Sequence, residues 1–313
     1  MMHLGSRRQM RVRGEPLRFY LSYCPSPIML KSVFDLNSYL EEKRRLIDAT
    51  LDAELPGEDV LPSLLHKAMR YSVLSAGKRL RSILCLSAAD TVGGSLEDAL
   101  FPALSVELLH TYTLIHDDLP CMDDDHFRRG KPACHIAFGE ANAILAGDAL
   151  QALAFEWMAR ARVPSKYSPN QLVVELAQAA GSQGVVGGQV EDLADQDGEL
   201  RPDRIEYIHL HKTADLFCAA VRIGSIVANS GEAELGMLTE YSVNVGLAFQ
   251  IVDDLLDEKK ENEQTCLSVY SPEDARERAE ALVDKALSAI EKIDRSRTEP
   301  LVAIARFVIE RTS

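Results

Sequence analysis

The sequence predicts an all-α protein, and three observations support this prediction. Apolar residues recur three and four positions apart over most of the chain after residue 35, which is the spacing of amphipathic helices. Alternating apolar and polar runs, the signal of half-buried strands, are nearly absent. Helix-breaking residues leave segments of roughly 15–25 residues between them, enough for helices about 20–40 Å long.

The expected helices follow one another between clusters of Gly, Pro and small polar residues. The clearest apolar stripes cover residues 64–69, 104–115, 172–180 and 282–293. The breaks fall at residues 56–57, 93–94, 129–132, 164–169, 197–198, 231 and 271–272. None of them is long enough to force a domain boundary, so a chain of 313 residues can form one large domain or two.

Composition excludes several classes of function. The formal net charge of −14 argues against non-specific binding to nucleic acid or to an anionic membrane. No run of about 18 apolar residues free of charge is present, so we expect no stable membrane insertion. The six cysteines are scattered without a C-x-x-C pair, which indicates reduced thiols and a cytoplasmic location.

Residues 1–30 differ from the rest of the chain because they are basic. They contain five arginines and a single acidic residue, Glu15. This segment has the composition of an organellar transit peptide but lacks the apolar core of a secretory signal. The other interpretation is that the start is mis-assigned and translation begins at Met29, or that the upstream residues are a disordered tail. We therefore expect a leader over residues 1–30 and a folded domain over residues 31–313, with organellar import if the leader is genuine.

Two aspartate clusters each close a long apolar segment, at residues 117–125 and 253–257. Neighbouring carboxylates about 4 Å apart repel each other by at least ~1 kcal/mol even in water, so each cluster needs a counter-charge. Mg²⁺ is commonly held by one or two carboxylates, several waters and the oxygens of a phosphate substrate. A solvated acidic face is the alternative, and it fits less well because both clusters follow apolar stretches. The clusters therefore predict two halves of one Mg²⁺ site.

The local geometry expected within each cluster favours this interpretation. Asp253 and Asp257 are four residues apart and share one face of a helix. Pro120 removes a backbone donor and should end or kink the first helix. The turn would let Asp123 return toward Asp117.

Basic residues accompany the aspartates in three groups, at residues 77–81, 128–129 and 209–213. Lys78 and Arg81 would share one helix face if a helix begins at residue 78. Each group alone could be a solvated turn. In a chain this acidic, cations beside carboxylate clusters favour a polyanion such as diphosphate, held partly by metal and partly by Arg or Lys.

Small residues are frequent in the middle of the chain, where Gly costs a helix up to ~1 kcal/mol relative to Ala. Close packing of helices is the favoured explanation, and a cavity that stays open between helices is the other. The small residues concerned are Ala143, Ala146, Gly147, Ala149, Gly181, Gly184, Gly187 and Gly188.

Taken together, these motifs resemble those of the short-chain trans-prenyl diphosphate synthases, the family that includes bacterial farnesyl and geranylgeranyl diphosphate synthases. The matching segments, in chain order, are residues 77–81, 109–125, 128–130, 146–149, 188–193, 211–213, 249–257 and 305–311. The resemblance implies a single-domain isoprenoid synthase bundle of long, mostly antiparallel helices around a central cavity. It also implies a homodimer and two or three Mg²⁺ ions per site.

The implied reaction is a Mg²⁺-dependent, head-to-tail condensation of isopentenyl diphosphate with an allylic diphosphate. The allylic substrate, dimethylallyl or geranyl diphosphate, loses diphosphate to give a carbocation. The double bond of isopentenyl diphosphate attacks this cation, and loss of a proton completes the longer chain. Tyr112, five residues before Asp117, could form the floor of the product tunnel and favours farnesyl diphosphate; geranylgeranyl diphosphate is the alternative product.

The resemblance also assigns roles to individual residues. Metal binding falls to Asp117, Asp118, Asp123, Asp253, Asp254 and Asp257. Binding of isopentenyl diphosphate falls to the motif of Gly77, Lys78 and Arg81 together with His110 and Arg129. Arg128 and Lys212 match contacts to the allylic diphosphate, Thr213 and Gln250 line the reacting centre, and Lys212 joins these two as a catalytic residue.

One departure from the family pattern follows the second aspartate cluster. About ten residues are missing after Asp257, which shortens a loop over the site and removes a lysine that normally meets the diphosphate. A catalytically weak relative that acts as a binding or regulatory subunit is therefore a second hypothesis. A terpene cyclase on the same fold is disfavoured, because Lys78, Arg81 and His110 preserve a site for a second diphosphate.

Overall fold

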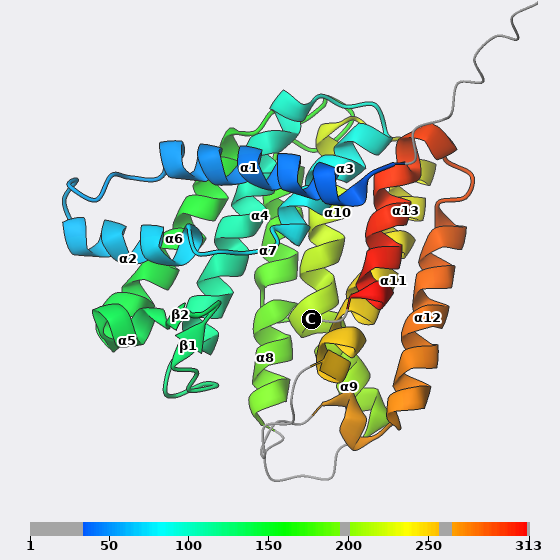
Figure 1. Cartoon of the computed structure of the whole chain (residues 1–313). Coiled ribbons are helices and arrows are strands. Elements are labelled where there is room, and N and C mark those ends of the chain that lie inside the picture. Colours follow the sequence, from blue (N-terminus) through cyan, green and yellow to red (C-terminus); the bar gives the residue numbers. More distant parts are fainter. Residues whose placement is uncertain (1–33, 195–200, 257–264, 312–313) are drawn as a thin grey trace, which may run out of the picture. The chain divides into compact units, whose positions relative to one another are not determined.

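The computed structural model describes residues 34–194, 201–256 and 265–311 (Figure 1). The expected leader at residues 1–30, Asp257 and the shortened loop that follows Asp257 lie outside the described residues. Within the described residues the protein is almost entirely helical, which confirms the all-α prediction.

The helices follow the predicted order. The first half of the described chain contains α1 (Leu36–Glu54), α2 (Ser63–Val73), α3 (Leu80–Thr91), α4 (Leu96–Asp117), α5 (Cys134–Phe138), α6 (Glu140–Arg160), α7 (Gln171–Ala180) and α8 (Val185–Leu193). The second half contains α9 (Pro202–Ile208), the π-helix η1 (His209–Ala214), α10 (Asp215–Val227), α11 (Glu232–Leu256), the 3₁₀-helix η2 (Cys266–Ser268), α12 (Pro272–Ala289) and α13 (Arg295–Glu310).

Local chemistry explains where several helices begin and end. The side chains of Asp35, Ser95 and Ser271 each accept a hydrogen bond from a backbone N–H in the first turn of α1, α4 and α12. Such N-caps satisfy donors that have no partner inside the helix. Helix α4 ends at Asp117, three residues before Pro120, as the missing proline donor predicts.

One short element was not predicted from the sequence, and the expected start of one helix was wrong. A short antiparallel hairpin, β1 (Phe127–Arg128) and β2 (Lys131–Pro132), interrupts the helices. Its turn residues Arg129 and Gly130 have φ of 54° and 77°, as the tight two-residue turn of a hairpin requires. Strands of two residues are too short to show an alternating pattern, so they could not be predicted from residue spacing.

The error concerns the start of α3. The helix begins at Leu80 rather than at residue 78, so Lys78 and Arg81 do not share a helix face. The physical reason is Arg79, which has a φ of 52° and whose guanidinium is buried between the carboxylates of Asp48 and Glu107, at 2.7 and 2.9 Å. This anchor holds the backbone before Leu80 outside helical geometry.

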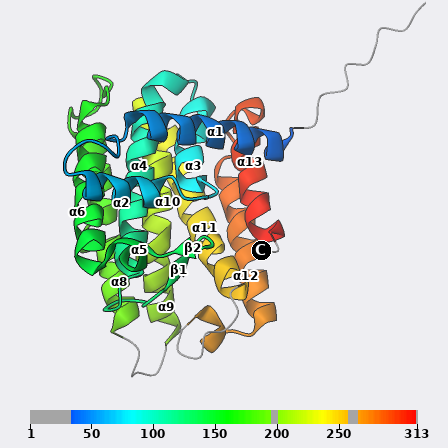
Figure 2. The same cartoon turned by 60° about the vertical axis from the view of Figure 1, so that its left-hand side comes forward.

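Helix α10 lies at the centre of the bundle and packs against α3, α4, α7 and α11. Figures 1 and 2 show α1 and α2 crossing the bundle at a steep angle to α10 and α11. Gly224 allows α10 to approach α3, because a Cβ there would lie 2.0 Å from the carbonyl oxygen of Cys85. Within the described part of the chain, no helix combines the length and apolar character needed to cross a bilayer.

Candidate functional site

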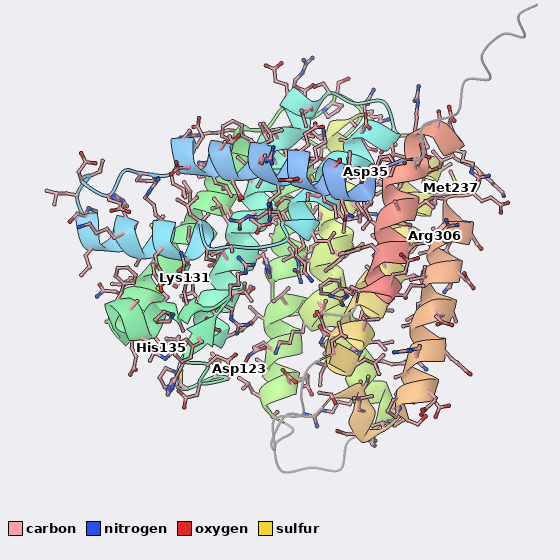
Figure 3. The ribbon with its side chains drawn as sticks, in the orientation of Figure 1. Asp35, Asp123, Lys131, His135, Met237 and Arg306 are labelled. Atoms are coloured by element: carbon pink, nitrogen blue, oxygen red, sulfur yellow. The ribbon has the colours of Figure 1, made fainter. Side chains whose placement is uncertain are left out.

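The first aspartate cluster forms where α4 ends. The backbone N–H of Asp123 donates to the carbonyl oxygen of Asp117 at 2.9 Å, so the chain folds back as Pro120 suggested. Asp124 has a φ of 52°, which completes the turn. Figure 3 shows Asp123 below the end of α4, and its carboxylate accepts a 3.4 Å hydrogen bond from Gln189 of α8. The turn therefore carries the first cluster from α4 toward α8.

Electrostatics in this cluster favour an added cation. Burial, with a smaller effect of the neighbouring carboxylate of Asp123, raises the pKa of Asp117 to about 7 against the opposing charge of Lys212. Burial also raises the pKa of Asp118, although a hydrogen bond from Arg128 opposes this. Ionised carboxylates here are thus unfavourable in the protein alone, and a bound cation would reverse that balance.

The hairpin directs Arg128 toward the same carboxylates. Its guanidinium Nε donates to Asp118 at 2.8 Å, and Nη2 pairs with Asp125 at 2.9 Å. These carboxylates raise the pKa of Arg128 despite its burial. Contact of Arg128 with a diphosphate stays a prediction, since in the structure its partners are carboxylates.

A second group of cations lies between α3, α4 and the hairpin. Arg81 donates to Nε2 of His110 at 3.3 Å and lies over the ring of Phe217. Burial lowers the pKa of Arg81 to about 10, and burial together with the charge of Arg81 lowers the pKa of His110. Arg81 Nε is buried without a hydrogen-bond partner among the described residues, so this guanidinium retains a donor for an anion.

Gly77 and Arg129 belong to the same group. A Cβ at Gly77 would lie 2.8 Å from Nη1 of Arg129, so the side chain of Arg129 rests on the loop before α3 and reaches Ser75 at 3.3 Å. Lys78 follows Gly77 in that loop. A cavity of about 30 Å³ adjoins both groups; among its lining residues are Ser75, Thr111, Asp118, Arg128, Arg129 and Cys134.

The π-helix η1 presents Lys212 and Thr213. A Cβ at Gly188 would lie 2.3 Å from the backbone nitrogen of Lys212, so only glycine lets α8 pack directly against this turn. Lys212 forms an ion pair with Asp192 of α8. Burial opposes the charge of Lys212, but Asp192, Asp117 and Asp123 outweigh burial and raise its pKa. Single π turns of this kind are frequent at functional sites.

Thr213 connects η1 to the second aspartate cluster. Its hydroxyl donates to Oε1 of Gln250 at 2.7 Å, and Nε2 of Gln250 donates to Asp254 at 2.8 Å. Asp254 is buried and also contacts Nε2 of His209 at 3.1 Å and the backbone N–H of Cys266 at 2.8 Å. Burial alone would raise the pKa of Asp254, but these hydrogen bonds lower it. Asp254 therefore fixes neighbouring groups, and its role as a metal ligand stays a prediction.

Asp253 is more accessible and pairs with Arg311, which lies in the matching segment 305–311 but was given no role from the sequence. Nη1 of Arg311 lies 2.7 Å from Oδ1 of Asp253, and Nη2 donates to the carbonyl oxygen of Phe249 at 2.6 Å. Arg311 follows α13, far from Asp253 in the sequence. Asp192 and Gln189 were also missed as partners of Lys212 and Asp123, although residues 188–193 formed one of the recognised motifs.

The donor set fits Mg²⁺ shared with a phosphate ligand. Among the described residues, no three side chains of His, Cys, Asp or Glu converge as they would on a metal held by protein alone. Asp117 and Asp123 instead offer carboxylate oxygens, the ligands that Mg²⁺ prefers, and leave positions for water and phosphate. A separate cavity of about 490 Å³, lined in part by His211, Asp215 and Arg222, contains none of the predicted site residues.

Comparison with known proteins places these features in context. The family described as "Polyprenyl synthetase" matches residues 62–278. The chloroplastic large subunit 1 of a heterodimeric geranylgeranyl pyrophosphate synthase from Arabidopsis thaliana is 40% identical over 300 residues, which cover 90% of this chain and 80% of the relative. Geranylgeranyl diphosphate synthase from Cyanophora paradoxa is 39% identical over 303 residues, 91% of this chain and 99% of the relative.

A solved structure shares the same arrangement of helices. The apo crystal structure of a FPP/GFPP synthase from Zymomonas mobilis is similar with a TM-score of 0.80 and 37% sequence identity. The similarity covers 88% of this chain and 98% of that chain.

Proposed function

The chain belongs to the polyprenyl synthetase family, and from this premise we propose that it joins isopentenyl diphosphate to dimethylallyl or geranyl diphosphate and releases farnesyl diphosphate. The predicted isoprenoid synthase fold and prenyltransferase activity are confirmed by the family match and by the similarity to solved synthases. The observation that carries the proposal is that the chain has two separate groups of residues, one for each diphosphate. The first contains Arg81, His110 and Arg129, and the second contains the aspartate clusters with Lys212. The number of Mg²⁺ ions, two or three, is part of the proposal.

The choice of product rests on Tyr112. This side chain lies on α4 one turn and a half before the first aspartate cluster and is 8% exposed. A buried ring at this position supports a tunnel that ends after a C15 chain. Geranylgeranyl diphosphate is the second candidate, favoured by the names of the two relatives above.

The proposed site for isopentenyl diphosphate combines Arg81, His110 and Arg129. A guanidinium cannot accept a hydrogen bond, so Nε2 of His110 accepts from Arg81 and the neutral ring carries its proton on Nδ1. The Nδ1–H group is then a neutral hydrogen-bond donor beside the two arginines, and the lowered pKa of His110 keeps the ring neutral. The group binds the diphosphate through charge-assisted hydrogen bonds.

The allylic diphosphate would lie between the aspartate clusters, beside Lys212. Bound Mg²⁺ would neutralise charge on the departing diphosphate and so favour ionisation. Asp192 holds Lys212 in place, and the hydrogen-bonded series Thr213, Gln250 and Asp254 fixes two side-chain oxygens next to it. Oriented oxygens of this kind stabilise a developing cation without having to reorganise.

The proposal is tested by incubating purified protein with Mg²⁺, isopentenyl diphosphate and labelled dimethylallyl, geranyl or farnesyl diphosphate, and then sizing the products. We expect C15 from the first two primers, no elongation of farnesyl diphosphate, and no product when EDTA removes Mg²⁺. A C20 product would favour the second candidate. Absence of elongation with every primer would overturn the proposal and favour the regulatory subunit.

Replacing Tyr112 is expected to lengthen the product. In Tyr112→Ala the missing ring opens space for a further isoprene unit, and discrimination by a filled pocket is worth about 10-fold or more in product ratio. The measurement is the C20:C15 ratio. Phe101→Ala removes a partly exposed aromatic ring from the same helix and should leave the ratio unchanged.

Replacing Gly188 is expected to lower activity, although Gly188 is not among the proposed substrate-binding residues. In Gly188→Ala the new Cβ meets the backbone of Lys212 at 2.3 Å and must displace η1, for which we expect a ~10–100-fold loss in kcat/KM. Gly236→Ala is the matched control, since Gly236 lies in α11 with no heavy atom within 4 Å of the added Cβ. Equal activity of the two variants would contradict the role given to Gly188.

We expect the chain to act as a homodimer, in the cytoplasm or in an organelle if residues 1–30 direct import. Exposed apolar side chains on α6 and α8 support a partner surface: Ile144, Leu145, Val186 and Val190. Light scattering of the purified chain decides this, because a monomeric mass at micromolar concentration would contradict it.

A further inference from the structure

His116 and Tyr112 touch each other on α4. They are four residues apart, and their rings meet edge to face with centroids 5.1 Å apart and an interplanar angle of 82°. Tyr112 is 8% exposed and the side chain of His116 is 23% exposed. The ring of His116 therefore limits the space that Tyr112 can occupy.

Helix α6 holds the other side of His116. A Cβ at Gly147 would lie 2.2 Å from Nε2 and 2.5 Å from Cδ2 of the imidazole, so any side chain there would expel the ring. Nε2 lies 3.1 Å from the carbonyl oxygen of Ile144, to which it donates as the Nε2–H tautomer. Ala143 and Ala146 are fully buried and bring α6 close to α4. The small residues of α6 thus leave a space that the imidazole ring of His116 fills.

From this arrangement we propose that His116, whose ring packs against Gly147, is a positioning residue that fixes the position of the Tyr112 ring. Both α6 and α4 then set the length of the product. The inference rests on the proposed function, in which Tyr112 closes the tunnel. His116 touches Tyr112 directly, whereas Gly147 acts through His116. An edge-to-face contact of this kind corresponds to a factor of about 2–10 in a conformational equilibrium.

A competing explanation is that His116 only packs α4 against α6. Loss of such packing lowers the melting temperature but leaves the lengths of the products unchanged. The position of Tyr112 is read out by the ratio of the next longer product to the wild-type product. This ratio separates the two explanations, because both products are made by the same folded molecules.

The experiment compares His116→Ala, Gly147→Ala, Tyr112→Ala and the double variant Tyr112→Ala/His116→Ala with the wild type. We expect His116→Ala and Gly147→Ala each to raise the product ratio about 2–10-fold, less than Tyr112→Ala does. The double variant should match Tyr112→Ala, since His116 has no ring left to position. His66→Ala is the control, because the ring of His66 also contacts a backbone carbonyl oxygen, but on α2 and with Val60 as its partner.

The outcomes are distinguishable. An unchanged ratio in His116→Ala, with a raised ratio in Tyr112→Ala, overturns the inference and leaves the proposed function intact. Effects that multiply in the double variant also overturn it, because His116 would then act independently of Tyr112. An unchanged ratio in Tyr112→Ala removes the premise that Tyr112 closes the tunnel. If His116→Ala fails to fold, Gly147→Ala decides the question by the same ratio.

Discussion

Asp117→Asn is expected to lower kcat/KM about 10³-fold or more while the fold stays as stable as the wild type or becomes more stable. The amide keeps the shape of the carboxylate but removes the charge proposed to hold Mg²⁺. A loss of 10³-fold corresponds to about 4 kcal/mol of transition-state stabilisation, the size expected for a group that acts on developing charge.

Stability should move in the opposite direction. Burial and the nearby carboxylate of Asp123 raise the pKa of Asp117, so its ionised form opposes folding when no cation is bound. The asparagine variant removes this repulsion. Thermal unfolding in EDTA measures the change.

Asp124→Asn is the matched control for Asp117→Asn. Asp124 lies in the same turn, its side chain is 59% exposed, and asparagine tolerates its positive φ. We expect less than about a threefold change in rate for this exposed group. Similar losses of activity in both variants would show that the turn, rather than the carboxylate of Asp117, is what matters.

Arg79→Met is expected to lower the free energy of unfolding by about 3–5 kcal/mol, because removing one partner of a buried ion pair leaves the other charge uncompensated. Arg79 and Glu107 are 3% and 1% exposed. Arg79 also donates to the carbonyl oxygens of Val73 and Ser75, at 2.6 and 3.2 Å. Methionine fills the space but offers no donor to any of these oxygens.

Urea denaturation followed by circular dichroism measures this loss. Arg45→Met removes an exposed ion pair with Glu41 on α1 and should cost no more than about 0.5 kcal/mol. The double variant Arg79→Met/Glu107→Leu should recover part of the loss, because it removes the unpaired carboxylate as well. A loss in Arg79→Met no larger than in Arg45→Met would mean that the buried pair contributes little.

Patterns within a few residues of the chain predicted most of the fold. The spacing of apolar residues predicted the helices, and the positions of Gly and Pro predicted where they end. Pro120 predicted the turn that returns Asp123 to the end of α4. These features depend on local backbone chemistry. The hairpin was missed because its strands have only two residues each, and the start of α3 was missed because it depends on two distant partners of Arg79, Asp48 and Glu107.

The same division applies to the site. The aspartates and most of the cations could be found from their residue types and their neighbours in the chain. The pairs Lys212 with Asp192 and Asp253 with Arg311 join residues that are 20 or more positions apart in the sequence, and no local pattern marks these pairings. The π-helical form of residues 209–214 has no sequence signature either, since a single wide turn is selected by the packing around it.

The π turn of η1 lets one helical segment do two things that a regular α-helix could not do together: bury an apolar face and direct Lys212 and Thr213 toward the site. Each residue of an α-helix advances the side chains by about 100°, so the extra residue of a π turn shifts the angular phase of everything that follows by about that amount. With this shift, α10 keeps its apolar face against the core while Lys212 and Thr213 turn toward Asp192 and Gln250. Deleting one residue from η1 would restore a regular helix and force a choice between the two orientations. This rotation of the side chains therefore allows the buried helix α10 and the site residues of η1 to belong to one continuous helical segment.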